Sequence, residues 1–203
     1  MREPYHCDTV RAVTERVWDK LFEAAIDQYG YLTPADAVTA GVDPAQLRIM
    51  FHRDRLERVD HGLYRLALVP TTELDQYMEM VLRTGRRGVL SDTTALDLLG
   101  LCDANPALIH VTVPTGFRTR REFPHVMQLH RRDLRPDEHT LHEGIPIVTP
   151  YRAIRDGIET GIGPHLIEQA IATATETGVL TVAEREELVG IGARVREYER
   201  TRR

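Results

Sequence analysis

The residues in this sequence that are best suited to chemistry are its carboxylates. Asp92, Asp97 and Asp103 fall around one expected helix, the kind of grouping that a carboxylate-dependent nuclease needs. Such a nuclease usually also places a lysine nearby, and Lys20, the only lysine, lies in a different helix near the start of the chain. The carboxylates therefore do not predict a nuclease.

The nine histidines raise the question of a metal site. His139 and His142 are three residues apart, and His110 and His130 lie at the ends of expected strands. Zinc sites are usually marked by Cys-x-x-Cys or His-Glu-x-x-His spacing, and neither accompanies these histidines. We expect no metal ion, and we interpret the histidines as scattered surface or partly buried side chains.

Motifs for nucleotide binding and covalent catalysis are also missing. No Gly-Lys pair is present, which excludes a phosphate-binding P-loop, and no Gly-x-Ser-x-Gly elbow occurs. The segment Gly161–Leu166 does not fit a dinucleotide-binding glycine motif and is better interpreted as a helix end, a turn and a new helix starting at Pro164. We predict a protein that is not an enzyme, with no catalytic residues and no cofactor.

Composition and charge restrict the function further. The 203 residues are 42% apolar and 28% charged, which is ordinary for a globular protein, and the net charge of −5 argues against unselective coating of nucleic acid. No apolar run is long enough to span a membrane, and no leader segment is visible, so we expect a cytoplasmic protein. Cys7 and Cys102 should then remain reduced thiols.

The N-terminal third carries the signals of three helices. Residues 10–28 show helical apolar spacing, and Gly30 follows as a stop signal. Thr33 before Pro34 predicts a capped helix that ends at Gly41. Asp43 before Pro44 repeats this pattern after a short connection. Two short helices joined in this way are typical of a helix-turn-helix.

A two-stranded hairpin is expected directly after these helices. Leu56 and Val59 precede a turn at residues 60–62, and alternating apolar residues follow over 63–68. Three helices and a terminal hairpin predict a winged helix, which we assign to residues 1–69.

The third helix presents the candidate DNA-binding face. Leu47, Met50 and Phe51 form an inward stripe, which leaves polar side chains on the opposite face. A helix of this size fits the major groove, where arginine can pair with guanine and glutamine with adenine, and further cations can hold phosphates. The predicted base-reading residues are Gln46, Arg48, His52 and Arg53, and the predicted backbone contacts are Arg55, Arg58, His61 and Arg65. The alternatives are a protein-docking helix-turn-helix and arginines held in solvated salt bridges.

Residues 70–203 are expected to form a larger α/β domain with a helical C-terminus, so that the whole chain is mixed α+β. Strands are predicted within 88–148, and helices within 150–203, the last of them divided into residues 181–192 and 193–203. Arg118, Arg120 and Arg121 form a basic loop that is either a second binding strip or a solvated loop. The strip would contact DNA phosphates, an acidic partner or an RNA.

The pattern resembles the AbiEi family of antitoxins from type IV toxin–antitoxin (abortive infection) systems. The resemblance lies in the order and spacing of six segments, residues 30–66, 89–101, 109–114, 118–124, 126–132 and 144–156. One departure is Asp92, which stands where the family pattern leads us to expect a histidine after the serine.

The resemblance implies a transcriptional repressor that binds inverted-repeat DNA of its own operon through the winged helix. It also implies that the C-terminal domain neutralises a cognate nucleotidyltransferase toxin, with or without a direct complex. The alternative is a stand-alone winged-helix regulator with a C-terminal ligand-binding or dimerisation domain. A nucleotidyltransferase gene in the same operon would favour the antitoxin.

Overall fold

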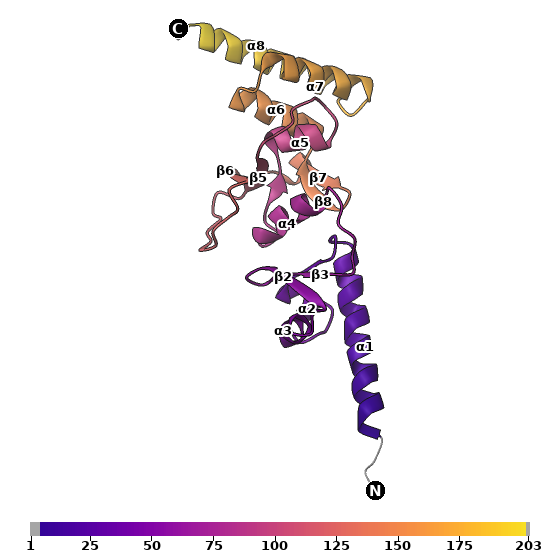
Figure 1. Ribbon diagram of the computed structural model, residues 1–203. Helices are drawn as coiled ribbons and strands as arrows, with labels where there is room; N and C mark the ends of the chain where they lie inside the picture. The colour runs from indigo at the N-terminus through magenta and orange to yellow at the C-terminus, as the bar shows by residue number, and fades with distance from the viewer. Residues whose placement is uncertain (1–4, 202–203) are drawn as a thin grey trace. The chain divides into compact units, whose positions relative to one another are not determined.

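The computed structural model describes the backbone of residues 5–201 and the side chains of residues 16–195, 197, 198, 200 and 201. The chain divides into two compact units, the first ending at Glu79 and the second beginning at Met80 (Figure 1). The described residues contain eight α-helices and two β-sheets, so the predicted mixed α+β class is confirmed.

The first unit combines three helices with a small antiparallel sheet of order β1-β3-β2. The predicted helices and hairpin are all present, whereas the sequence analysis missed the two-residue strand β1 and began the first helix too late. The elements are α1 (Tyr5–Ile26), β1 (Tyr31–Leu32), α2 (Pro34–Thr39), α3 (Ala45–Phe51), β2 (Leu56–Asp60) and β3 (Leu63–Leu66).

Local side-chain chemistry explains where α2 begins. The Thr33 hydroxyl accepts a bond from the Asp36 N–H, while the Asp36 carboxylate accepts one from the Thr33 N–H at 2.7 Å. This reciprocal capping box satisfies two backbone donors at the helix start, and Pro34 occupies the first turn. Gly41 then takes a left-handed φ of 67°, which lets the chain turn into the next helix.

The core of the first unit lies between α1, the two short helices and the sheet. Side chains that are completely buried include Leu21 from α1, Leu47 from α3 and Leu66 from β3. Because both α3 and the hairpin are anchored to this core, the side chains on their outer surfaces have defined positions relative to one another.

The second unit is built around a five-stranded sheet of order β6-β5-β4-β8-β7. The pairs β4–β8 and β5–β6 are parallel, and β4–β5 and β7–β8 are antiparallel. Helix α4 (Asp75–Arg83) precedes it along the chain. The remaining elements are β4 (Val89–Leu90), α5 (Asp92–Leu98), β5 (Ile109–Val113), β6 (Met127–Arg131), the 3-10 turn η1 (Pro136–Glu138), β7 (His139–His142), β8 (Ile145–Val148), α6 (Pro150–Thr160), α7 (Pro164–Glu176) and α8 (Val182–Thr201).

The second unit differs from the sequence-based description in two details. His139 and His142 lie in strand β7, which pairs with β8 through a turn at Glu143 and Gly144, and the sequence analysis did not predict this strand. The last predicted helix is also not divided at residue 192, because α8 runs unbroken from Val182 to Thr201. Among the helices within residues 5–201, none has both the length and the apolar composition needed to cross a membrane.

Candidate nucleic-acid interface and a polar cluster in the second unit

Helix α3 is oriented by its apolar stripe. Leu47 is fully buried and Met50 is 3% exposed, which confirms the inward face for these two residues, whereas Phe51 is only half-buried. The opposite face carries the exposed side chains of Arg48, His52 and Arg53, whereas Gln46 is half-buried. Every residue predicted to contact bases therefore keeps at least part of its surface accessible.

The outer face of α3 also contains a residue that the sequence analysis missed. Ile49 is 40% exposed and lies three and four residues before His52 and Arg53, so that the three share one helix face. Ile49 does not belong to the predicted inward stripe. Its position outside the stripe is the sequence signal that could have identified it as an exposed apolar residue.

The hairpin brings an arginine and a histidine to the same side of the unit. The turn is closed by Gly62, with a φ of 69°, and by a bond from the His61 N–H to Asp60 Oδ1 at 2.6 Å. The register of β2 and β3 shifts between Arg58 and Asp60, which marks a local irregularity in β2. Arg58 Nη2 lies 3.4 Å from His61 Nδ1, so these two side chains project together.

Helix α3 and the hairpin border one groove of about 520 Å³, which we call the cationic groove. Arg48 and His52 line it from the helix, and Arg58 and His61 line it from the hairpin. The remaining lining is uncharged and comes from Pro34, Pro44, Ala45, Phe51, Gly62 and Tyr64. Among the described residues that line the groove, none is acidic, which gives it a positive character that the net charge of the chain conceals.

Arg53 and Arg55 lie outside the lining of this groove. Both are exposed, and the Arg55 guanidinium is 5.5 Å from the centre of the Trp18 ring on α1. This distance fits a cation–π contact, which would position the Arg55 side chain. A role of Arg55 in DNA binding stays a prediction.

Arg65 must be removed from the predicted phosphate contacts. Its side chain is buried in β3, where Nη2 lies 2.8 Å from Asp75 Oδ2 and also donates to the Val69 carbonyl at 2.8 Å. The sequence pattern of the strand could not show that the Arg65 side chain is buried. Its partner, the Asp75 carboxylate, lies ten residues further along the chain. The guanidinium is thus a structural group of the first unit.

The arginine loop of the second unit is exposed and has no regular secondary structure between Arg118 and Pro124. Arg118 Nη1 donates to the carbonyls of Thr115 and Phe117 at 3.1 and 3.0 Å, so this side chain is tied to its own loop. Arg120 and Arg121 remain exposed. A second binding strip at this loop stays a prediction.

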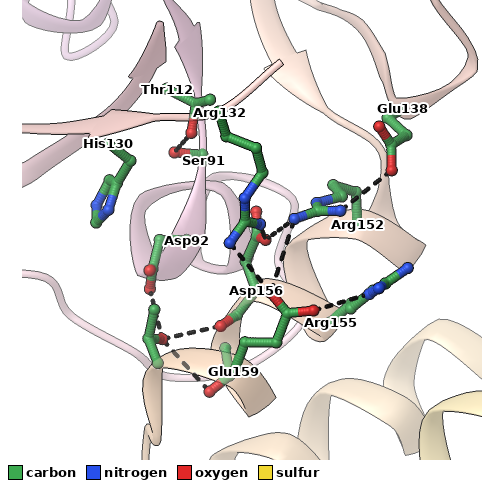
Figure 2. Close-up of polar contacts among 12 residues, drawn as sticks. Ser91, Asp92, Thr112, His130, Arg132, Glu138, Arg152, Arg155, Asp156 and Glu159 are labelled. Atoms are coloured by element: carbon green, nitrogen blue, oxygen red, sulfur yellow. Dashed lines mark hydrogen bonds and ion pairs between the residues drawn. The ribbon is translucent and has the colours of Figure 1, made fainter. Parts of the chain in front are cut away.

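A polar cluster covers the region where α6 approaches the end of β6 (Figure 2). The buried Arg152 guanidinium contacts Glu138 Oε1 at 3.1 Å and Asp156 Oδ1 at 2.6 Å, and Arg132 pairs with Asp156 and Glu159. Burial raises the pKa of the Asp156 carboxyl to about 6, and Arg132 acts in the opposite direction. At neutral pH this carboxyl is still mostly ionised, so the cluster joins η1, β6 and α6 through paired charges.

Beside this cluster, two histidines and one aspartate meet on the sheet. His110 Nδ1 and His130 Nε2 are 2.9 Å apart, and Asp92 offers a carboxylate oxygen close to both. Burial lowers the pKa of His110, although Asp92 opposes this shift. The sequence analysis placed both histidines at strand ends but could not pair them, because β5 and β6 are separated by a long loop whose register only the fold determines.

Comparison with known proteins bears on the first unit. A family model described as "Transcriptional regulator, AbiEi antitoxin" matches residues 19–67, a segment that contains every residue lining the cationic groove. No curated protein matches the chain. Among solved structures, that of the RV2827C protein from Mycobacterium tuberculosis is 15% identical, with 88% of this chain and 77% of that chain covered and a TM-score of 0.47.

Proposed function

We propose that the first unit is a winged helix that binds double-stranded DNA, which is supported by the match of residues 19–67 to the family model described as "Transcriptional regulator, AbiEi antitoxin". The observation that carries this proposal is the cationic groove, which gathers Arg48, His52, Arg58 and His61 from two separate elements. A cationic surface bordered by an exposed helix and a projecting hairpin suits a duplex, since the helix fits the major groove and the hairpin meets the adjoining backbone.

Helix α3 supplies the sequence-reading contacts in this proposal. Arg48 and Arg53 are long enough to donate two bonds to one guanine, and Gln46 can pair with an adenine. The exposed side chain of Ile49 offers apolar contact to a thymine methyl group. His52 completes the face as a hydrogen-bonding group.

The hairpin and the end of the helix supply the sequence-independent contacts. Arg58 and His61 at the hairpin, together with Arg55, bind phosphates in this arrangement. Phosphate contacts of this kind position the protein and make affinity strongly dependent on salt.

The biological role that fits such a module is repression of the protein's own operon. Binding as two protomers to an inverted repeat would require half-sites separated by about 10 bp or a multiple. We further propose that the second unit neutralises a cognate nucleotidyltransferase toxin, which is supported by the antitoxin description of the family that matches the first unit.

DNA binding is tested by fluorescence anisotropy with the full chain and the DNA upstream of its gene. Arg48→Ala should weaken binding to the operator by about 1–3 kcal/mol while affecting scrambled DNA much less, because it removes a base contact. Arg58→Ala should weaken both DNAs alike and reduce the slope of log K against log salt by about 0.9. Arg194→Ala, an exposed arginine of α8, is the matched control and should change neither quantity.

The antitoxin role is tested by growth of cells that express a nucleotidyltransferase encoded in the same operon. Co-expression of the full chain should restore growth, and Arg48→Ala should still restore it, since neutralisation is assigned to the second unit. Normal operator binding without any rescue of growth would favour a stand-alone regulator. Unchanged operator binding in both Arg48→Ala and Arg58→Ala would reject the DNA-binding assignment itself.

A further inference from the structure

We propose that Asp92, His110 and His130 of the second unit form a binding site for a divalent transition-metal ion. Each residue offers one ligand atom, and the three atoms all lie within 4.8 Å of one another. Two imidazole nitrogens and one carboxylate oxygen are a donor set that suits zinc and its first-row neighbours. This site is separate from the DNA-binding function and does not depend on it.

The distance between the two imidazole nitrogens fits ligands of one ion. His110 Nδ1 and His130 Nε2 are 2.9 Å apart. Metal–nitrogen bonds of about 2.1 Å would place two adjacent ligands of an octahedral ion about 3.0 Å apart, and those of a tetrahedral ion about 3.4 Å apart. The separation of the two nitrogens is therefore compatible with two ligands of one ion.

The sheet places both histidines on one face. Strands β5 and β6 are parallel, with His110 opposite Gln128 and His130 opposite Thr112. Because side chains alternate along a strand, these four residues point to the same side of the sheet. Ile109 and Val111 then point to the other side, where they are buried in the core.

Asp92 is held over this face by bonds to β5. The neighbouring Ser91 donates its N–H to the His110 carbonyl at 3.0 Å and accepts the Thr112 hydroxyl at 2.8 Å, as Figure 2 shows for the Ser91–Thr112 pair. Thr94 of the same helix bonds to the His110 N–H at 2.9 Å. The three ligand residues thus belong to backbone segments that are already fastened together, which is what a preorganised site requires.

The conformation of Asp92 is unusual for a buried residue. It is only 4% exposed, and its φ of 55° lies in the left-handed region, which aspartate and asparagine adopt more readily than other residues with a side chain.

The Asp92 carboxylate also lacks the partner that its burial calls for. Within the described part of the chain no arginine pairs with it, whereas the neighbouring Asp156 has both Arg132 and Arg152. Its hydrogen bonds, from the Thr93 N–H at 2.7 Å and Thr160 at 3.5 Å, both end on Oδ1. A buried carboxylate is costly unless a positive charge compensates it, and a divalent cation between the two histidines would supply that charge.

Three protein ligands leave coordination positions open. Structural zinc sites are usually closed by four protein ligands, whereas sites with three keep a position for water or another small ligand. The site should therefore bind an exogenous ligand such as imidazole or azide once the ion is present.

The test is metal binding by the full chain after removal of adventitious ions with a chelator. Calorimetric titration with zinc sulfate should give a stoichiometry of one ion per chain. Atomic absorption on the dialysed protein should give the same value. Cobalt(II) should give a visible absorption band that changes when imidazole is added. Asp92→Asn, His110→Gln and His130→Gln should each weaken zinc binding by at least about tenfold.

Two features keep the test decisive. Asparagine is nearly isosteric with aspartate and tolerates the left-handed conformation, so Asp92→Asn should remain folded. His165→Gln, which alters an exposed histidine of α7, is the matched control and should bind zinc as the unaltered chain does. Zinc should also raise the melting temperature of the unaltered chain but not that of Asp92→Asn.

The proposal is overturned if the unaltered chain takes up no zinc at micromolar concentration, because the cluster is then only a hydrogen-bonded pair of histidines. It is equally overturned if zinc binds but Asp92→Asn and His130→Gln retain the affinity of the His165→Gln control, since the ion would then lie elsewhere.

Discussion

Replacing Arg65 should destabilise the first unit instead of removing a contact to DNA. Arg65 is 7% exposed and Asp75 is 6% exposed, so both partners of the ion pair are buried. Arg65→Met keeps the length and the apolar stem of the side chain while removing its charge and donors. The variant therefore isolates the contribution of the ion pair.

The size of the effect follows from the bonds that are lost. Asp75 Oδ2 loses two donors, Nε at 3.2 Å and Nη2 at 2.8 Å, while Thr72 still donates twice to Oδ1 at 2.8 Å. The Val69 carbonyl loses a third bond from the same guanidinium. Removing one partner of a buried ion pair typically costs about 3–5 kcal/mol, because the remaining charge stays buried without compensation.

The single tryptophan allows the loss of stability to be measured for the first unit alone. Trp18 packs against the core of that unit, so its fluorescence during urea unfolding reports on this part of the chain. Arg65→Met should lower the free energy of unfolding by about 3–5 kcal/mol, while Arg58→Met, an exposed arginine of the same hairpin, should lower it by less than about 0.5 kcal/mol. Arg65→Met/Asp75→Asn should recover part of the loss, because the orphaned charge is gone.

A loss below about 1 kcal/mol in Arg65→Met would refute the reasoning, and so would losses that simply add in the double variant. Under conditions where Arg65→Met is fully folded, its salt slope for DNA binding should equal that of the unaltered chain. A slope reduced by about 0.9 would instead indicate that Arg65 contacts a DNA phosphate.

Three further predictions concern packing and helix continuity. Gly30 has a φ of 85° and an added Cβ would lie 2.9 Å from the Val69 Cβ, so Gly30→Ala should destabilise the first unit by about 1–3 kcal/mol in the same tryptophan assay. Arg152→Met breaks the buried pair with Glu138 and should lower the stability of the second unit by about 3–5 kcal/mol in thermal unfolding by circular dichroism, without moving the tryptophan transition. Gly190 lies inside α8 with no close neighbour for a Cβ except the Arg194 guanidinium at 3.6 Å, so Gly190→Ala should stabilise the second unit by about 0.5–1 kcal/mol; a loss of stability would argue for a break in the helix there.

Much of the first unit could be predicted because its signals are local. The Thr33–Asp36 capping box and the glycine at the hairpin turn act within a few residues, so the sequence alone indicates where α2 begins and where the chain reverses. The inward stripe of α3 repeats with helical spacing, which correctly separated the buried from the exposed side chains. The same locality explains the identification of most helices in the second unit.

What the sequence could not determine depends on contacts between distant residues. Arg65 resembles any other arginine of a hairpin until β3 packs beside Asp75, where burial and charge pairing decide its role. His110 and His130 are separated by twenty residues, and only the parallel register of β5 and β6 places them on one face beneath Asp92. Sequence thus determined the elements and their outward faces through short-range hydrogen bonding and apolar spacing. Tertiary structure decided which charged groups and histidines meet, because their interactions require closure of long loops that carry no local signal.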